Sequence, residues 1–95
     1  MSAVTADQIL AAAGADIAQR GPLRDQPTGE RSMSRAIAAF NALHGTCLTE
    51  VQGWQFMELL KHARATGGKH HPDDHQDRAA YAALAGEAAA REAAR

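Results

Sequence analysis

The clearest helix signals of the chain lie in residues 49–66, TEVQGWQFMELLKHARAT. Thr49 followed three residues later by Gln52 is the pattern of a capping box, which marks a helix start. Large apolar side chains then recur every three residues and define one helix face: Val51, Trp54, Met57 and Leu60. The pattern predicts a helix over 49–66 and places Trp54 in the core rather than on a nucleotide base.

Three further helices are predicted, two before residues 49–66 and one after them. Thr5 and Gln8 form a second capping-box pattern, and the helix that they start is expected to end near residue 19, before Gly21-Pro22. The remaining two are expected over residues 29–44 and 74–92, on stripes made by Met33, Ile37, Phe40 and Leu43 and by Tyr81, Leu84 and Ala88. No alternating apolar run predicts a strand, so residues 1–95 are interpreted as one all-α, four-helix domain with helices at about 5–19, 29–44, 49–66 and 74–92.

The chain has many apolar residues, but more than half of them have small side chains. Apolar residues make up 45% of the 95 residues, and alanine accounts for 23 of them. Alanine buries little area, so four such helices cannot build a large core within one chain. The composition therefore predicts a homo-oligomer.

Charge and cysteine content exclude several classes of protein. The net charge is −1, which argues against binding duplex nucleic acid through counterion release. No apolar run approaches the roughly 20 residues that span a bilayer, and the start lacks the features of a signal peptide, so no membrane partner is expected. Cys47 is alone, which favours a reducing, cytoplasmic setting, and it is interpreted as a small apolar residue at a helix junction.

Two clusters of polar residues could carry catalysis, and both are interpreted otherwise. Histidines and aspartates crowd residues 70–77 but lack the spacing of a known metal site, so they are expected to form a polar loop and an acidic helix start. Glu50 and Glu58 are eight residues apart, whereas all-α nucleotide pyrophosphohydrolases bind Mg²⁺ through a Glu-x-x-Glu pattern. No enzyme activity, metal or cofactor is therefore predicted.

The stretch between residues 20 and 32 has two possible interpretations. Arg24 and Arg31 flank an expected helix start at Thr28-Gly29, and arginines beside helix N–H groups form an anion site. An ordinary polar connection with Thr28 as N-cap explains the same residues.

This stretch also carries a resemblance to a known family. Residues 25–33, Asp-Gln-Pro-Thr-Gly-Glu-Arg-Ser-Met, resemble the Asp-Lys-Pro-x-Gly-Glu-Arg-Ser-Met signature of small tailed-phage proteins. The similarity continues through Glu50-x-x-Gly53-Trp54-x-Phe56-Met57 and Asp77-x-Ala79-Ala80-Tyr81, and covers about residues 7–89. One branch of that family comprises the anti-CBASS sponges, all-helical interlocked hexamers that sequester cyclic dinucleotide and trinucleotide immune signals in the infected bacterial cytoplasm without cleaving them.

The resemblance implies a set of ligand-binding positions. For the cyclic dinucleotide, Thr28 matches the family threonine, while Gln26 and Ala11 stand where the sponges have a lysine and a stacking aromatic side chain. For the trinucleotide, Pro72 matches, and Gly67 stands at the arginine position, with Arg64 and Lys69 close in sequence. Together with the flanking arginines, the predicted ligand-binding residues are Ala11, Arg24, Gln26, Thr28, Arg31, Arg64, Gly67, Lys69 and Pro72.

Two alternative functions remain open from the sequence. One is a phage structural or protein-binding module, and the other is an all-α nucleotide pyrophosphohydrolase. Titration with cyclic oligonucleotides distinguishes the sponge from the first alternative, and product analysis with Mg²⁺ tests the second.

Overall fold

The computed structural model describes residues 3–26, 29–30 and 32–95, and it describes the backbone alone for residues 20–26 and 29–30. Within these residues the chain forms four helices: α1 (Ala6–Arg24), α2 (Ser32–His44), α3 (Glu50–Thr66) and α4 (Pro72–Ala93). A two-residue antiparallel pair, β1 (Asp25–Gln26) and β2 (Gly29–Glu30), lies between α1 and α2. The prediction of an all-helical domain with four helices is confirmed.

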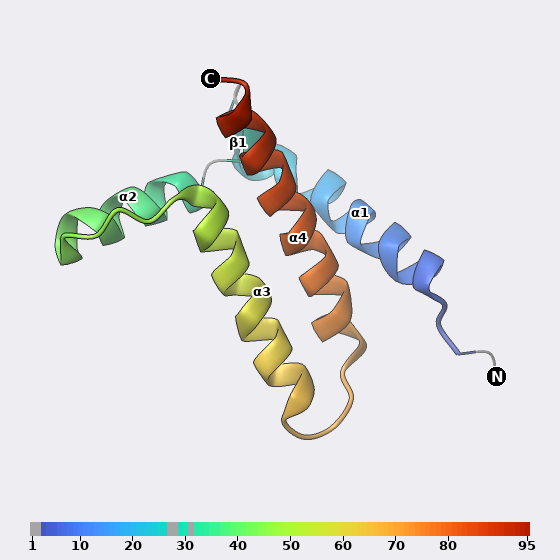
Figure 1. Ribbon diagram of the computed structural model, residues 1–95. Helices are drawn as coiled ribbons and strands as arrows, with labels where there is room; N and C mark the ends of the chain where they lie inside the picture. The colour runs from blue at the N-terminus through green and yellow to red at the C-terminus, as the bar shows by residue number, and fades with distance from the viewer. Residues whose placement is uncertain (1–2, 27–28, 31) are drawn as a thin grey trace.

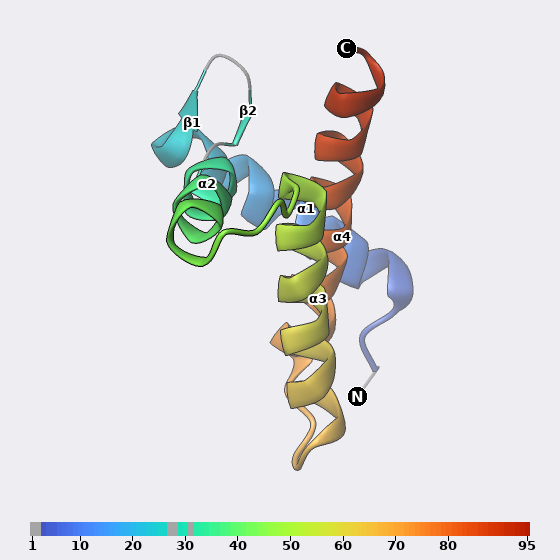
Figure 2. The same ribbon diagram turned by 60° about the vertical axis from the view of Figure 1, so that its left-hand side comes forward.

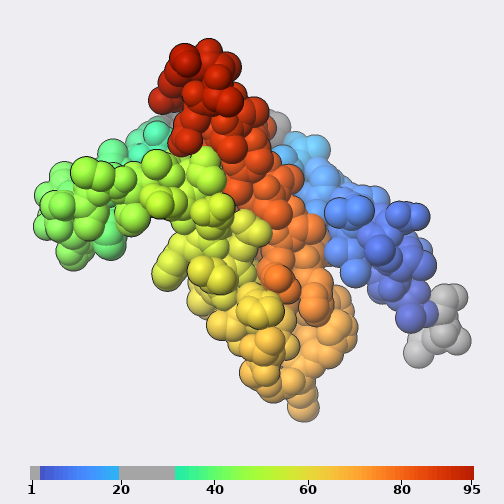
Figure 3. All heavy atoms as spheres, viewed as in Figure 1, coloured from blue at the N-terminus to red at the C-terminus, as the bar shows by residue number. Residues whose placement is uncertain are grey.

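The helices are arranged as a hairpin with two attachments (Figure 1). α3 and α4 lie side by side and antiparallel, and they make the most extensive contact in the molecule. α1 packs across α4, whereas α2 extends away from the hairpin, as the rotated view also shows (Figure 2). With all heavy atoms drawn, α2 still projects from the side of the hairpin (Figure 3). The extents of 49 × 30 × 24 Å reflect this open arrangement.

The core lies between α3 and α4. Among the described residues, Trp54 is the one large apolar side chain that is buried, at 7% exposure, and it packs against Ala85 and Ala88. Its ring stacks on Tyr81, with the ring centroids 5.8 Å apart. The prediction that Trp54 belongs to the core is confirmed, as is the stripe through Tyr81, Leu84 and Ala88.

Local signals explain the helix starts at α1 and α3. Thr49 accepts a hydrogen bond from the Gln52 N–H and donates its own N–H to the Gln52 side chain, which completes the capping box. Thr5 and Gln8 make the same reciprocal pair before α1. α4 begins at Pro72, two residues earlier than predicted, because proline suits the first turn, where its missing N–H would have no helical partner.

Two predicted boundaries are wrong. α1 continues through Gly21-Pro22 to Arg24; proline removes one backbone hydrogen bond there, and the helix ends two residues later. α2 begins at Ser32 rather than at Thr28 or Gly29, because Gly29 pairs with Gln26 in the strand ladder. Thr28 itself lies outside the described residues.

Gly53 allows α2 to approach α3 closely. A Cβ atom at this position would lie 2.5 Å from the Met33 sulfur and 2.9 Å from Cγ1 of Ile37. Glycine is thus the residue that accommodates these two α2 side chains on α3. The connection after α2 then folds back along that helix, because Asn41 hydrogen-bonds both the N–H and the carbonyl of Leu48.

Candidate functional site

The predicted ligand-binding residues fall into two regions. Arg64, Gly67, Lys69 and Pro72 lie together in or beside the turn that joins α3 to α4. Arg24 and Gln26 lie at the end of α1 and in β1. Figures 1 and 2 place this second region near the opposite end of the hairpin from the α3–α4 turn, so one chain does not bring the two regions together.

The α3–α4 turn presents polar groups to solvent. Gly67 ends α3 and donates its N–H to the Arg64 carbonyl over 3.3 Å. Gly68 has φ +108°, a left-handed conformation that favours glycine. The side chains of Arg64, Lys69 and Pro72 are all exposed, so the turn offers two cations beside the N-terminus of α4.

The histidines of the turn do not form a metal site with the residues described. His70 and His75 lie with their ring centroids 5.8 Å apart, at an interplanar angle of 33°. Asp73 and Asp74 occupy the first turn of α4, where negative charge stabilises the helix dipole, and Asp74 is buried. No three His, Cys, Asp or Glu side chains within the described ranges converge for metal binding.

The region before α2 is only partly described. Thr28 and Arg31 lie outside the described residues, so their predicted contacts have no structural counterpart here. Ala11 is exposed on α1, and an alanine side chain offers no ring for stacking on a base. The prediction of an anion-binding helix N-terminus at Thr28-Gly29 is wrong, because α2 starts at Ser32.

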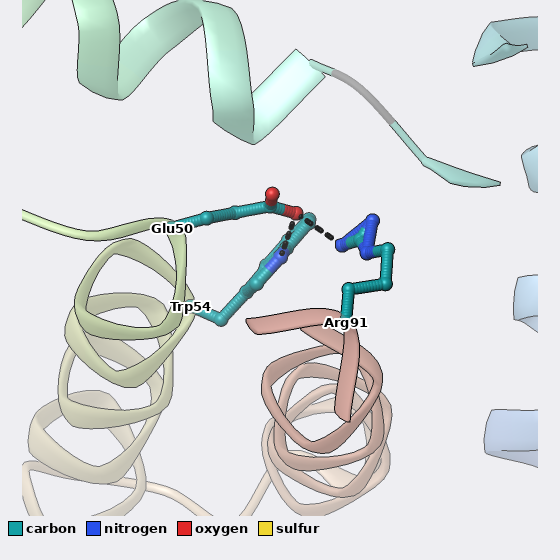
Figure 4. A network of polar contacts seen from close by, with 3 residues as sticks. All are labelled: Glu50, Trp54 and Arg91. Atoms are coloured by element: carbon teal, nitrogen blue, oxygen red, sulfur yellow. Dashed lines mark hydrogen bonds and ion pairs between the residues drawn. The ribbon is translucent and has the colours of Figure 1, made fainter. Parts of the chain in front are cut away.

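A polar groove between α2, the start of α3 and the end of α4 was not predicted. It has a volume of about 330 Å³ and is lined by residues that include Ser34, Asn41, Glu50, Arg91 and Arg95. One Oε2 atom of Glu50 accepts hydrogen bonds from Arg91, at 2.8 Å, and from the Trp54 indole nitrogen, at 3.4 Å (Figure 4). Glu50 and Arg91 are 41 residues apart, so no local sequence pattern indicates the pair.

Two carboxylates of the hairpin form ion pairs between α3 and α4. Asp77 forms an ion pair with Lys61 at 2.9 Å, and Glu50 forms one with Arg91. The hydrogen bond to Asp77 raises the pKa of Lys61, against the opposing effect of burial. These pairs place Asp77 and Glu50, which were both considered as metal ligands, in contacts that join α3 to α4.

Cys47 lies in the connection between α2 and α3, which confirms its predicted place at a helix junction, and it is exposed. His44, in the last turn of α2, places its ring 4.4 Å from that of Phe40.

No helix within the described part of the chain has the length and apolar character needed to cross a bilayer. No match was found among curated proteins or among solved structures. One family does match, over residues 8–89, and its description is Domain of unknown function (DUF6378). Because the match covers most of the 95 residues, the chain belongs to the DUF6378 family.

Proposed function

We propose that this protein is a non-catalytic, homo-oligomeric binder of cyclic oligonucleotide signals, a sponge that acts in the cytoplasm of a phage-infected bacterium. The observation that carries the proposal is the signature-like stretch at residues 25–33, within a resemblance to the phage sponges that spans about residues 7–89. The resemblance favours an interlocked assembly, and a hexamer among the possible sizes.

The α3–α4 turn supports a role in binding an anionic ligand. Arg64 and Lys69 are exposed there beside Pro72, and neither forms an ion pair with a described residue. Exposed cations suit the phosphates of a cyclic nucleotide, with which they form charge-assisted hydrogen bonds. This turn is the proposed trinucleotide contact.

The region around Gln26 and Thr28 is the proposed dinucleotide contact. Glutamine in place of lysine removes a charge-assisted hydrogen bond to phosphate, which is typically worth about 1.5–3 kcal/mol. Since about 1.4 kcal/mol corresponds to a factor of ten, affinity at this contact is expected to be about tenfold or more below that of a lysine-bearing relative.

Isothermal titration with a panel of cyclic dinucleotides and trinucleotides tests the proposal. Saturable binding is expected, with Gln26→Lys tightening and Thr28→Ala weakening the binding of dinucleotides. A matched pair, Lys69→Met at the turn and Arg95→Met at an exposed position beyond the other end of α4, separates a specific loss at the turn from a general loss of positive charge. Absence of heat with every member of the panel would overturn the proposal and leave a structural or protein-binding role.

Recovery of the ligand tests the absence of turnover. Nucleotide released by heat after incubation with Mg²⁺ is expected to be chemically unchanged by mass spectrometry. A linear or hydrolysed product that depends on this protein would place the chain among enzymes instead.

A further inference from the structure

The outward face of α3 has the composition of a buried surface. Phe56 and Leu59 are 66% and 64% exposed, and they lie on one stripe with Gln52 and Ala63, spaced i, i+4, i+7 and i+11. No charged residue interrupts this stripe. Glu50 and Lys61, by contrast, form ion pairs with α4, so these two charges lie on the packed side of α3 near Trp54, while Phe56 and Leu59 face solvent.

α2 has a second face of this kind. Its Met33 and Ile37 side chains pack over Gly53, whereas Phe40 and Leu43 are 43% and 81% exposed. Ala36 and Ala39 continue the exposed stripe toward the start of the helix. None of the 13 residues of α2, all of which are described, is buried.

The surface area of the chain exceeds that of a free-standing monomer. The accessible surface is 6768 Å², whereas a monomer of 10.0 kDa typically exposes about 5,200 Å². The radius of gyration is 14.7 Å, against about 12.4 Å for a compact chain of this length. The excess of about 1,500 Å² is close to twice the roughly 800 Å² that each partner buries in a standard interface.

Two faces and an excess area that suits two contacts indicate what covers them. We infer that the outer face of α2, with Phe40 and Leu43, packs on the outer face of α3, with Phe56 and Leu59, of a second copy of this chain. A net charge of −1 leaves little repulsion between copies. When two copies pack in this way, α2 of each copy lies on α3 of the other, and both apolar faces of both copies are covered.

Shape favours this pairing over pairing of like faces. The small Ala36 and Ala39 on α2 leave room for large side chains such as Phe56 and Leu59 on α3.

This contact specifies the assembly part of the proposed function and does not depend on nucleotide binding. Its test is therefore made without nucleotide, so that failure of the contact and failure of the sponge activity give different results.

Single charges on the two faces provide the test, with Leu43→Glu in one variant and Phe56→Lys in another. Each variant is expected to fall toward the monomer mass of 10.0 kDa in light scattering, because a charge buried without a partner is costly. An equal mixture of the two variants is expected to recover the mass of the unmodified protein. In such a mixed pair the introduced carboxylate meets the introduced ammonium group across one contact, while the other contact keeps Leu43 and Phe56. Ala83→Glu, at an exposed position of α4, is the control for added charge and is expected to leave the mass unchanged.

Far-UV circular dichroism checks that each variant keeps its helices, as expected for exposed positions. Unchanged mass in both single variants would overturn the inference. Folded single variants that dissociate but do not reassemble on mixing would also contradict it, because the two faces would then contact something other than each other.

Discussion

Between α3 and α4, apolar side chains meet in the core and ion pairs join the two helices, whereas α2 leaves Phe40 and Leu43 exposed to solvent. Trp54 is 7% exposed, and Leu43 on α2 is 81% exposed. α2 and α3 both have apolar residues at helical spacing, so the pattern itself does not distinguish these two helices. The difference teaches that an apolar stripe predicts a covered face but not whether the cover comes from the same chain.

The largest effect is expected at the centre of the hairpin. Trp54→Ala removes the one large buried side chain among the described residues and should lower the free energy of unfolding by about 3–5 kcal/mol. Urea denaturation at fixed protein concentration measures the change, since assembly makes stability depend on concentration. Leu10→Ala, at a position 62% exposed on α1, is the control and should change stability by about 0.5 kcal/mol or less. A comparable loss in both variants would contradict the placement of the core.

The next largest effect on stability is expected at Gly53, where α2 packs on α3. Gly53→Ala places a methyl group against Met33 and Ile37, and the resulting overpacking should cost about 1–3 kcal/mol despite the better helix propensity of alanine. Gly86→Ala is the matched substitution on α4, where nothing lies within 4 Å of the added Cβ. It should instead stabilise the protein by up to about 1 kcal/mol. Thermal unfolding of the two variants measures the difference. Equal shifts of Tm in the same direction would show that α2 does not pack closely on Gly53.

The ion pair between Glu50 and Arg91, which lies beside Trp54, is expected to contribute less to stability. Glu50→Gln keeps the size of the side chain but removes the charge that Arg91 and the indole N–H contact, and it should cost about 1–2 kcal/mol. A double-mutant cycle with Arg91→Met measures the coupling, which should be favourable and weaker in high salt. Additive single effects would mean that the pair does not join α3 to α4.

The smallest effect is expected at the helix start. Thr49→Ala removes the side-chain acceptor of the α3 capping box and should cost about 1 kcal/mol. Thr49→Ser keeps that acceptor and should retain most of the stability in the same denaturation experiment. Equal losses for alanine and serine would show that the hydroxyl is not what stabilises the helix start.

Local rules predicted the hairpin well because its determinants are close in sequence. The capping box at Thr49 and Gln52 and the stripe through Tyr81 and Ala88 require no knowledge of distant contacts. The start of α2 was missed because Thr28-Gly29 resembles a cap, while pairing of Gly29 with Gln26 decides the backbone there. The role of Gly53 was missed because it depends on which helix crosses α3.

The candidate site was predictable where it is contiguous. The positions from Arg64 to Pro72 form one turn, so their sequence proximity already places them together. The groove beside Glu50 was not predictable, because it is assembled from three helices and its central ion pair joins residues 41 positions apart. The proposed contact between copies came from the exposed fractions of Phe56 and Leu59, which the stripe pattern alone does not reveal.

The mass of the unmodified chain in solution tests most directly whether its outward helix faces are covered by other copies. Multi-angle light scattering at micromolar concentration, without nucleotide, should give a multiple of 10.0 kDa, with six copies expected from the resemblance to the sponges. A mass of 10.0 kDa throughout that concentration range would contradict the account, because the apolar faces of α2 and α3 would then be exposed in a stable monomer.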